Sequence, residues 1–292
     1  MKQGTLKAEG VCKSYGSKQV LHNLDLTIEP GKIYGLIGRN GAGKTTLLGI
    51  LTGQNTMDSG TVTYDGQTVW ENRAALENIC FSRELTATMV GGMKVKYLLE
   101  AASIFYPGWD KAYAQRLLEL FKLEPKKKIQ QLSKGQASMV TILIAMASRS
   151  PLTILDEPAA GLDVVAREQF YRLLLEDFAK TNRTFIVSSH IIEEAASVFE
   201  RVIILDEGRI IENAETETLV GEFVYVSGHE DQVMQACRNL RVLQSQKTGR
   251  HLINSVRATQ DELAQMKEVD VDVAPMNLQK VFVALCGHDD IG

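Results

Sequence analysis

The chain opens with alternating hydrophobic and polar positions, the pattern of half-buried β-strands. Strands are predicted at Thr5–Lys13, Gln19–Leu21 and Leu24–Ile28, with turn residues after the first and the last. An uninterrupted apolar run, Lys32–Ile37, follows and indicates a strand that is buried on both faces. Glycine-rich residues come directly after it and lead into a predicted helix at Lys44–Leu51. This region therefore predicts strands that lead into a buried strand, a tight turn and a helix.

The middle of the chain changes from strands to helices and back again. After a strand at Asn78–Phe81, apolar residues at i, i+3 and i+4 predict three successive helices. Buried strands then alternate with helices, which implies a largely parallel sheet into which the helical block is inserted. The predicted helices of the block are Met93–Phe105, Asp110–Phe121 and Gln136–Ala147, the later strands Leu152–Leu155, Phe185–Ser188 and Val202–Leu205, and the later helices Val164–Ala179 and Ile191–Phe199.

The pattern changes once more after about Thr218, which predicts a domain of residues 1–221 and a second of residues 222–292. The second domain has the order βαββαβ of a ferredoxin-like fold, followed by a helix at Leu278–Leu285. Its predicted strands and helices are Phe223–Ser227, Glu230–Asn239, Arg241–Gln246, His251–Val256, Gln260–Met266 and Val269–Val273. We interpret it as a dimerisation or regulatory module, or as a packing extension.

Composition narrows the class of protein only slightly. The 292 residues are 45% hydrophobic and 23% charged, with a formal net charge of −4, which is typical of soluble globular proteins. After Asn213 there are seven basic and twelve acidic residues, so the C-terminal domain is the more acidic part. A mildly acidic chain argues against a dedicated nucleic-acid binder, and no nucleic acid is expected as a partner.

Export, membrane-spanning and disulfide signals are not visible in the sequence. The longest nearly uncharged apolar stretch, Met139–Ser148, is about half the ~20 residues of a spanning helix, and the N-terminus has no apolar leader. The cysteines Cys12, Cys80, Cys237 and Cys286 are scattered, which predicts unpaired thiols in a reducing compartment. We therefore expect a cytoplasmic protein.

A glycine-rich turn carries the first candidate chemistry. Residues 38–45 fit G-x-x-x-x-G-K-[ST], with a buried strand before them and a helix after them. In such a turn backbone N–H groups surround phosphate oxygens, Lys44 reaches the β- and γ-phosphates, and the Thr45 hydroxyl ligates Mg²⁺. A merely glycine-rich turn is the alternative. The predicted nucleotide-binding residues are Gly38, Asn40, Gly41, Ala42, Gly43, Lys44, Thr45 and Thr46.

Two acids end the next buried strand, at Asp156 and Glu157. They lie where ligands bind in parallel sheets, at the carboxyl ends of the strands. Asp156 suits the Mg²⁺ shell, and Glu157 is placed to polarise an attacking water. Alone, such a pair would be read as an ordinary helix cap, but with a P-loop upstream the catalytic interpretation is favoured.

The third motif, Leu132-Ser-Lys-Gly-Gln136, stands before a long helix and about twenty residues before Asp156. At this spacing it resembles the LSGGQ signature of ATP-binding cassette (ABC) ATPases. Asp163, at the end of Ala159-Ala-Gly-Leu-Asp, resembles the D-loop aspartate, and His190 resembles the switch histidine. Tyr15 resembles the aromatic residue that stacks on adenine. The resemblance covers residues Thr5 to Asn213.

The resemblance implies a P-loop NTPase fold with a β-subdomain, a RecA-like parallel core and an inserted helical subdomain at about 85–148. It also implies a head-to-tail dimer, either of two copies or with a paired ATPase subunit. ATP held by Tyr15 and the P-loop of one subunit would be covered by Ser133, Gly135 and Gln136 of the other. Glu157 would position water, His190 would contact the γ-phosphate, and Asp163 would link the two sites.

Two positions depart from the family pattern. Where most members have a glutamine that contacts Mg²⁺, this chain offers Glu84, whose carboxylate can also ligate Mg²⁺. Where the signature has its first glycine, this chain has Lys134, and a cation near a γ-phosphate is not expected to inactivate the site. ATP and Mg²⁺ are therefore the expected cofactors.

By this resemblance, the chain is the ATPase subunit of an exporter on the inner face of the cell membrane, with its transmembrane subunits on separate chains. The residues around Glu84 look most like single-cassette exporters of Gram-positive bacteria for drugs or antimicrobial and amphipathic peptides. The permease is expected to dock near residues 84–107. The alternatives are a soluble ABC ATPase that acts on ribosomes or nucleic acid, and an importer ATPase. Candidate groove residues are Leu85, Thr86, Met89, Val90, Tyr97, Leu98 and Tyr106.

Overall fold

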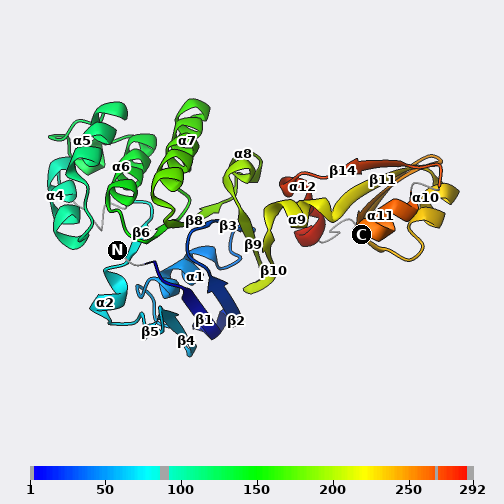
Figure 1. The fold of residues 1–292 in the computed structure, drawn as a ribbon, viewed down its shortest axis with the longest axis horizontal. Helices are drawn as coiled ribbons and strands as arrows, with labels where there is room; N and C mark the ends of the chain where they lie inside the picture. Colours follow the sequence, from blue (N-terminus) through cyan, green and yellow to red (C-terminus); the bar gives the residue numbers. More distant parts are fainter. Residues whose placement is uncertain (1–2, 86–91, 267–268, 288–292) are drawn as a thin grey trace. The chain divides into compact units, whose positions relative to one another are not determined.

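The computed structural model describes residues 3–85, 92–266 and 269–287. Contacts divide the chain into two compact units, Met1–Glu212 and Asn213–Gly292, and each has a sheet and a hydrophobic cluster of its own (Figure 1). The boundary lies before the helix Thr216–Gly221 (α9), whereas the change in sequence pattern placed it after residue 221. Among the described residues, no helix has the length and apolar character needed to cross a membrane.

The first unit begins with a four-stranded sheet in the order β2-β1-β4-β5. The prediction of separate strands at Gln19–Leu21 and Leu24–Ile28 was wrong, because β2 runs unbroken through both. Asn23 has a φ of 45° and the pairing with β1 shifts register nearby, so the break in the pattern is a bulge rather than a turn. The strands are β1 (Leu6–Tyr15), β2 (Lys18–Ile28), β4 (Ser59–Tyr64) and β5 (Gln67–Thr68).

A six-stranded sheet in the order β10-β9-β3-β8-β7-β6 forms the centre of the first unit. The pairs β9–β3, β3–β8, β8–β7 and β7–β6 are parallel, so their carboxyl ends meet at one edge. This confirms the predicted parallel core. The strands are β3 (Ile33–Ile37), β6 (Ile79–Ser82), β7 (Leu152–Leu155), β8 (Thr184–Ser189), β9 (Arg201–Asp206) and β10 (Arg209–Glu215).

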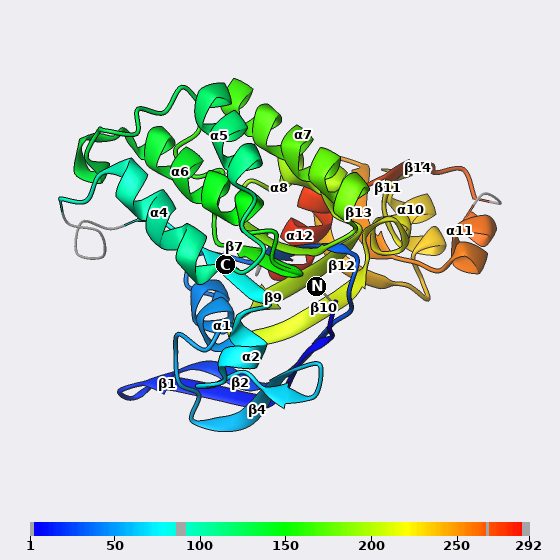
Figure 2. The same cartoon turned by 60° about the vertical axis from the view of Figure 1, so that its left-hand side comes forward.

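The helix α1 (Lys44–Leu51) lies between the two sheets (Figure 2). Leu47 and Leu48 are fully buried in one cluster with residues of β1, β2, β3, β7, β8 and β9. The predicted helix Ile191–Phe199 is instead a short α8 followed by a 3₁₀ turn. The other helices outside the insertion are α2 (Arg73–Leu76), α7 (Val164–Thr181), α8 (Ile192–Ala195) and η2 (Ala196–Val198).

The helical insertion lies between β6 and β7, as the sequence predicted. Asp110 begins α5 by accepting a hydrogen bond from the Tyr113 N–H at 2.9 Å. Its carboxylate also accepts from Arg149 at 3.0 Å, and Arg149 and Arg183 both pair with the buried Asp177 of α7. These charges connect the insertion to α7 and β8. Its helices are α4 (Val95–Phe105), α5 (Lys111–Leu120), η1 (Ile129–Gln131) and α6 (Lys134–Ala147).

The second unit has the βαββαβ order and an antiparallel sheet in the order β12-β13-β11-β14. Its last strand begins at Asp272 rather than at Val269, because the N–H groups of Val269 and Val271 bond locally to the carbonyls of Met266 and Val269. Its elements after α9 are β11 (Phe223–His229), α10 (Glu230–Ala236), β12 (Arg241–Thr248), β13 (His251–Arg257), α11 (Gln260–Met266), β14 (Asp272–Pro275) and α12 (Leu278–Cys286).

Candidate nucleotide-binding site

Loops that leave neighbouring strands of the central sheet converge at its carboxyl edge. The glycine-rich turn follows β3, Asp156 and Glu157 follow β7, and His190 follows β8. Because β3, β8 and β7 are adjacent and parallel, residues far apart in the sequence meet here.

The turn after β3 needs glycine at several positions for different reasons. Gly41 and Gly43 have φ angles of 84° and 107°, in the region that favours glycine. A Cβ at Gly38 would lie 2.4 Å from the carbonyl oxygen of Leu205 in β9. Ala42 is held by its N–H, which donates to the Arg39 carbonyl at 3.1 Å. The turn is therefore fixed against the sheet, while Asn40 and Gly41 remain exposed at its tip.

Lys44 is buried at the start of α1 and its ammonium group points back into the turn. The Nζ atom donates to the Gly38 carbonyl at 2.7 Å and to the Arg39 carbonyl at 3.4 Å. It also lies 3.8 Å from Oε1 of Glu157. A cation held over a glycine turn at a helix N-terminus is an arrangement that attracts phosphate. Thr46, the last of the predicted turn residues, is partly buried in α1.

Thr45 and Asp156 are joined directly. The Thr45 hydroxyl donates to Oδ2 of Asp156 at 2.9 Å, and the Ser188 hydroxyl donates to Oδ1 at 2.6 Å. The same Ser188 oxygen accepts the Glu157 N–H at 2.8 Å. One buried hydroxyl therefore orients both acids.

Glu157 lies between two positively chargeable groups. Its Oε1 faces Lys44, and its Oε2 is 2.5 Å from Nδ1 of His190. The Glu157 backbone has a φ of 50°, a strained value for a residue other than glycine. Such strain often occurs at functional sites. The carboxylate is thus held at the sheet edge, within reach of a bound γ-phosphate.

The residues around Thr45 fit Mg²⁺. The Thr45 hydroxyl and the Asp156 carboxylate are oxygen ligands, which Mg²⁺ prefers, and this ion commonly takes only one or two carboxylates and completes its shell with phosphates and water. Within residues 3–85, 92–266 and 269–287, no three His, Cys, Asp or Glu side chains gather closely enough to hold a metal. A magnesium site here would therefore need the nucleotide's phosphates as ligands.

The signature residues form a second group at the start of α6. Ser133 caps the helix by accepting the Gln136 N–H at 3.1 Å, while the Gln136 side chain accepts the Ser133 N–H at 3.2 Å. A Cβ at Gly135 would lie 2.9 Å from the Gly161 carbonyl, so α6 approaches the D-loop closely. Asp163 caps α7 by accepting the Ala166 N–H at 2.8 Å.

The structure does not join this second group to the P-loop. In the described part of the chain, no hydrogen bond or ion pair links Ser133, Gly135 or Gln136 to residues 38–46. Glu84 also stays apart from Thr45 and Asp156, and its Oε1 lies 3.5 Å from Nζ of Lys134 instead. Tyr15, at the end of β1, is 52% exposed, and the Lys13 ammonium lies 5.2 Å from its ring centre.

Ser188 is the functional residue that sequence reasoning missed. It is the fifth residue of an apolar strand and is fully buried. A polar residue before His190 was the available signal, but only the structure shows that it bonds to the two acids of a different strand.

The fold and this geometry define a P-loop ATPase site. The profile described as "ABC transporter" matches residues 21–160. A lantibiotic transport ATP-binding protein, SrtF of Streptococcus pyogenes, is 32% identical over 70% of this chain and 89% of its own length. The chain therefore belongs to the ABC transporter family, as an ATP-binding subunit that hydrolyses ATP.

Other relatives extend the similarity. ABC transporter ATP-binding protein YtrB of Bacillus subtilis is 27% identical over 94% of this chain and 96% of its own length. A solved structure described as a dimeric, post-hydrolysis ATP-binding cassette bound to ADP and phosphate has a TM-score of 0.63 and 25% identity, and it covers 72% of this chain and 98% of that one. Related cassettes thus form dimers.

We expect Ser188→Ala to lower ATP hydrolysis about 10- to 100-fold, the usual effect of removing a hydrogen bond that orients a ligand. Steady-state hydrolysis by the purified chain measures this. Ser150→Ala is a matched control. Ser150 is also buried, but it lies just before the first residue of β7, at the end of the sheet away from Asp156 and Glu157. An equal loss in both variants would contradict the orienting role of Ser188.

Proposed function

We propose that this chain is the nucleotide-binding subunit of an ABC exporter whose membrane subunits are separate chains. Full-length similarity to a protein named for export carries the proposal. The Nod factor export ATP-binding protein I of Cupriavidus metallidurans is 29% identical over 97% of this chain and 98% of its own length. Relatives with such names favour a transport function over a soluble ATPase that acts on ribosomes or nucleic acid. They also favour an exporter over an importer. We place the chain on the inner face of the membrane, with peptides or drugs as the substrate class.

The geometry of the site supports the catalytic assignment that we propose. Tyr15 stacks on adenine, and the P-loop N–H groups and Lys44 hold the phosphates. Thr45 and Asp156 would hold Mg²⁺, which would lower the charge on the phosphates when bound. Glu157 takes a proton from the attacking water, since its carboxylate is fixed by Lys44 and His190. His190 reaches the γ-phosphate, and Glu84 supplies a further oxygen for Mg²⁺ in the closed state.

The proposed dimer is supported by the separation of the signature residues from the P-loop within one chain. We assign Ser133, Gly135 and Gln136 to the γ-phosphate of ATP bound by a second subunit, where the positive end of α6 faces the anion. The D-loop that leads to Asp163 contacts α6, because the Ser138 hydroxyl donates to the Ala160 carbonyl at 2.8 Å. The two sites are thereby connected. A homodimer is the simplest assembly, and the C-terminal unit stabilises or regulates it.

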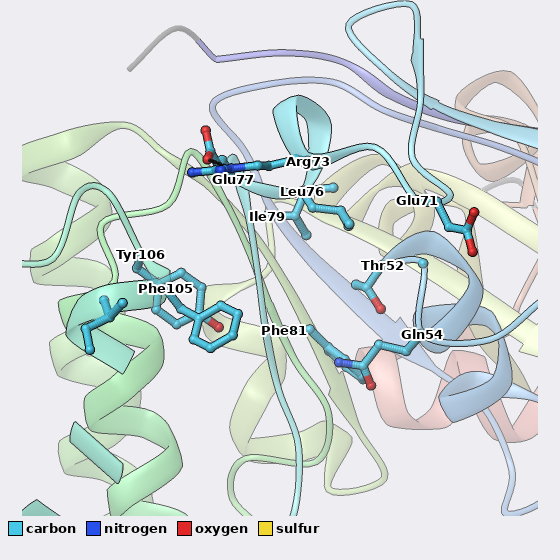
Figure 3. Close-up of a pocket in the computed structure, with 12 residues that line it drawn as sticks. Thr52, Gln54, Glu71, Arg73, Leu76, Glu77, Ile79, Phe81, Phe105 and Tyr106 are labelled. Atoms are coloured by element: carbon cyan, nitrogen blue, oxygen red, sulfur yellow. Dashed lines mark hydrogen bonds and ion pairs between the residues drawn. The ribbon is translucent and has the colours of Figure 1, made fainter. Parts of the chain in front are cut away.

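A cavity in the first unit provides the docking site for a membrane subunit. Its volume is about 710 Å³, and it opens between the end of α4 and the region of α2 and β6. Phe105 and Tyr106 point toward Phe81 across it (Figure 3). Its lining residues are Thr52, Gly53, Gln54, Glu71, Arg73, Leu76, Glu77, Ile79, Phe81, Ile104, Phe105 and Tyr106.

The chemistry of this cavity suits an amphipathic helix. Ile104 and Phe105 are 81% and 79% exposed, which is unusual for large apolar side chains and marks an interaction surface. Burial raises the pKa of Tyr106 far above its usual value, so its hydroxyl stays neutral. Glu71, Arg73 and Glu77 add charge at the rim. A coupling helix with an apolar face and charged flanks would fit.

Only some of the predicted groove residues contribute. Tyr106 lines the cavity, whereas Leu85, Tyr97 and Leu98 are not among its lining residues. Thr86, Met89 and Val90 lie outside the described residues. The predicted docking region, residues 84–107, therefore reaches the cavity through its last residues.

We expect the double change Ile104→Ser and Phe105→Ser to lower recovery of a polytopic membrane protein with the tagged chain by about tenfold, because buried anchors dominate interfaces. Quantitative mass spectrometry after detergent purification measures recovery. Leu175→Ser is the control, since Leu175 is a 42% exposed leucine on α7. Hydrolysis by the isolated variant should stay unchanged. Recovery of ribosomes instead of a membrane protein would reject the exporter proposal.

A further inference from the structure

The two departures from the ABC pattern lie side by side in the structure. Glu84 follows β6 and Lys134 begins α6, and Nζ of Lys134 is 3.5 Å from Oε1 of Glu84. Their side chains are 67% and 58% exposed, so water and other ions reach the pair. An exposed pair of this kind is weak and is easily exchanged for another partner.

The direction of Lys134 is set by the D-loop. Its side-chain stem lies over Gly161, where a Cβ would be 2.6 Å from Cγ of Lys134. Gly161 has a φ of 83°, which favours glycine, so the backbone of the D-loop requires a residue without a side chain where the lysine passes. The lysine therefore runs from the signature motif across the D-loop to the loop that carries Glu84, and it contacts all three motifs.

The position of Lys134 also creates a demand for negative charge. It is the first residue of a 14-residue helix whose first turn contains no acidic residue. A cation there adds to the positive end of the helix dipole, which is unfavourable unless an anion is near. Glu84 supplies that anion within the same subunit.

We propose that the Glu84 carboxylate and the γ-phosphate of ATP held by the second subunit compete for Lys134. The inference rests on the proposed function, in which the start of α6 faces that phosphate. Lys134 is then a further ATP-contacting residue, and Glu84 holds it in the ATP-free subunit. When the dimer closes, Lys134 binds the phosphate instead of Glu84, because the phosphate carries more negative charge than a carboxylate.

This exchange couples the two ATP sites. Glu84 belongs to the same chain as Lys134, whereas the phosphate belongs to ATP bound by the other chain. When ATP at one site binds Lys134 of the opposite subunit, the Glu84 carboxylate of that opposite subunit loses its partner. This carboxylate would then be available as an oxygen ligand for Mg²⁺ at its own subunit's site. Closure at one site thereby prepares the other.

The test is a double-mutant cycle of Glu84→Gln and Lys134→Gln in the full chain, with Glu157→Gln present throughout to prevent turnover. The ATP concentration at half-maximal dimerisation, from light scattering with MgATP, is the readout. Glu84→Gln should lower it about two- to fivefold, the range typical of an exposed ion pair. Lys134→Gln should raise this ATP concentration. In the Lys134→Gln background, adding Glu84→Gln should have no further effect on it. The glutamine amide in Glu84→Gln keeps an oxygen that can bind Mg²⁺. If Glu84→Gln acted through Mg²⁺ rather than through Lys134, its effect on the midpoint would remain in the Lys134→Gln background.

Glu29→Gln is the matched control. Glu29 pairs with Lys32 at 2.9 Å, and this exposed ion pair lies away from the signature motif. Glu29→Gln should not change the ATP concentration at half-maximal dimerisation. The effect of Glu84→Gln on this concentration should decrease at high salt, which screens exposed charges. An equal effect of Glu84→Gln with and without Lys134 would overturn the competition alone. A parent that does not dimerise with ATP at all would overturn the dimer proposal as well.

Discussion

Glu157→Gln is expected to slow ATP hydrolysis by about 10²- to 10⁴-fold, the usual contribution of a general base, while ATP binding is retained. The amide cannot take a proton from water, but it preserves the size and the polar contacts of the side chain. Its amide oxygen can still face Lys44, and its amide nitrogen takes the place of the carboxylate oxygen beside His190. The phosphate-holding turn is unchanged, so ATP should accumulate in a closed dimer.

Single-turnover hydrolysis and size-exclusion chromatography with MgATP measure the two effects separately. Glu168→Gln is a suitable control, because Glu168 is an exposed glutamate of α7 with the same chemistry and a position outside the site. Hydrolysis near the wild-type rate in Glu157→Gln would remove Glu157 from the catalytic role. A normal dimer with lost hydrolysis would support it.

The parallel core could be predicted from sequence because its strands are buried on both faces. Leu152–Leu155 has the predicted bounds, because a short buried strand admits few alternatives. The helix Lys44–Leu51 also has them, since it starts directly after the glycine-rich turn. Weaker patterns failed locally. At Asn23 the break in alternation is a bulge, and at Val269 local hydrogen bonds delay the last strand.

The candidate site likewise has parts that could be predicted from the sequence and parts that could not. The P-loop is one contiguous segment in which glycine, lysine and threonine each have a chemical reason for their position. Ser188 could not be recognised, because its partners Asp156 and Glu157 belong to another strand and its importance comes from register. The cavity was predicted only in part: the sequence indicated the segment that contains Tyr106, but not the residues of β6 and α2 that line the other side.

The proposed division of the site between two subunits also has a physical basis. Ser133 and Gln136 satisfy each other in a capping box and thus hold the start of α6 in shape without a nucleotide. Lys44 similarly satisfies its own turn carbonyls. Each half therefore holds its local shape through its own hydrogen bonds and presents the positive end of a helix, α1 or α6. In the proposed dimer the phosphates of ATP lie between these two helix ends.

The second large effect is expected for Lys44→Ala, which should weaken ATP binding about 10- to 100-fold. Loss of one charge-assisted hydrogen bond accounts for about 1.5–3 kcal/mol. The ammonium group also donates to the carbonyls of Gly38 and Arg39, so its removal loosens the turn that surrounds the phosphates. The carboxylate of Glu157 would in addition lose a nearby cation and repel the γ-phosphate.

Titration with a fluorescent ATP analogue gives the dissociation constant, and thermal unfolding without nucleotide shows whether the variant remains folded. Lys32→Ala is the control, because Lys32 immediately precedes β3 at the opposite end of the strand from the turn and pairs with Glu29. Unchanged ATP affinity in folded Lys44→Ala would refute the P-loop assignment. Equal losses in the two variants would mean that positive charge on the cassette, rather than a directed ammonium group, governs binding.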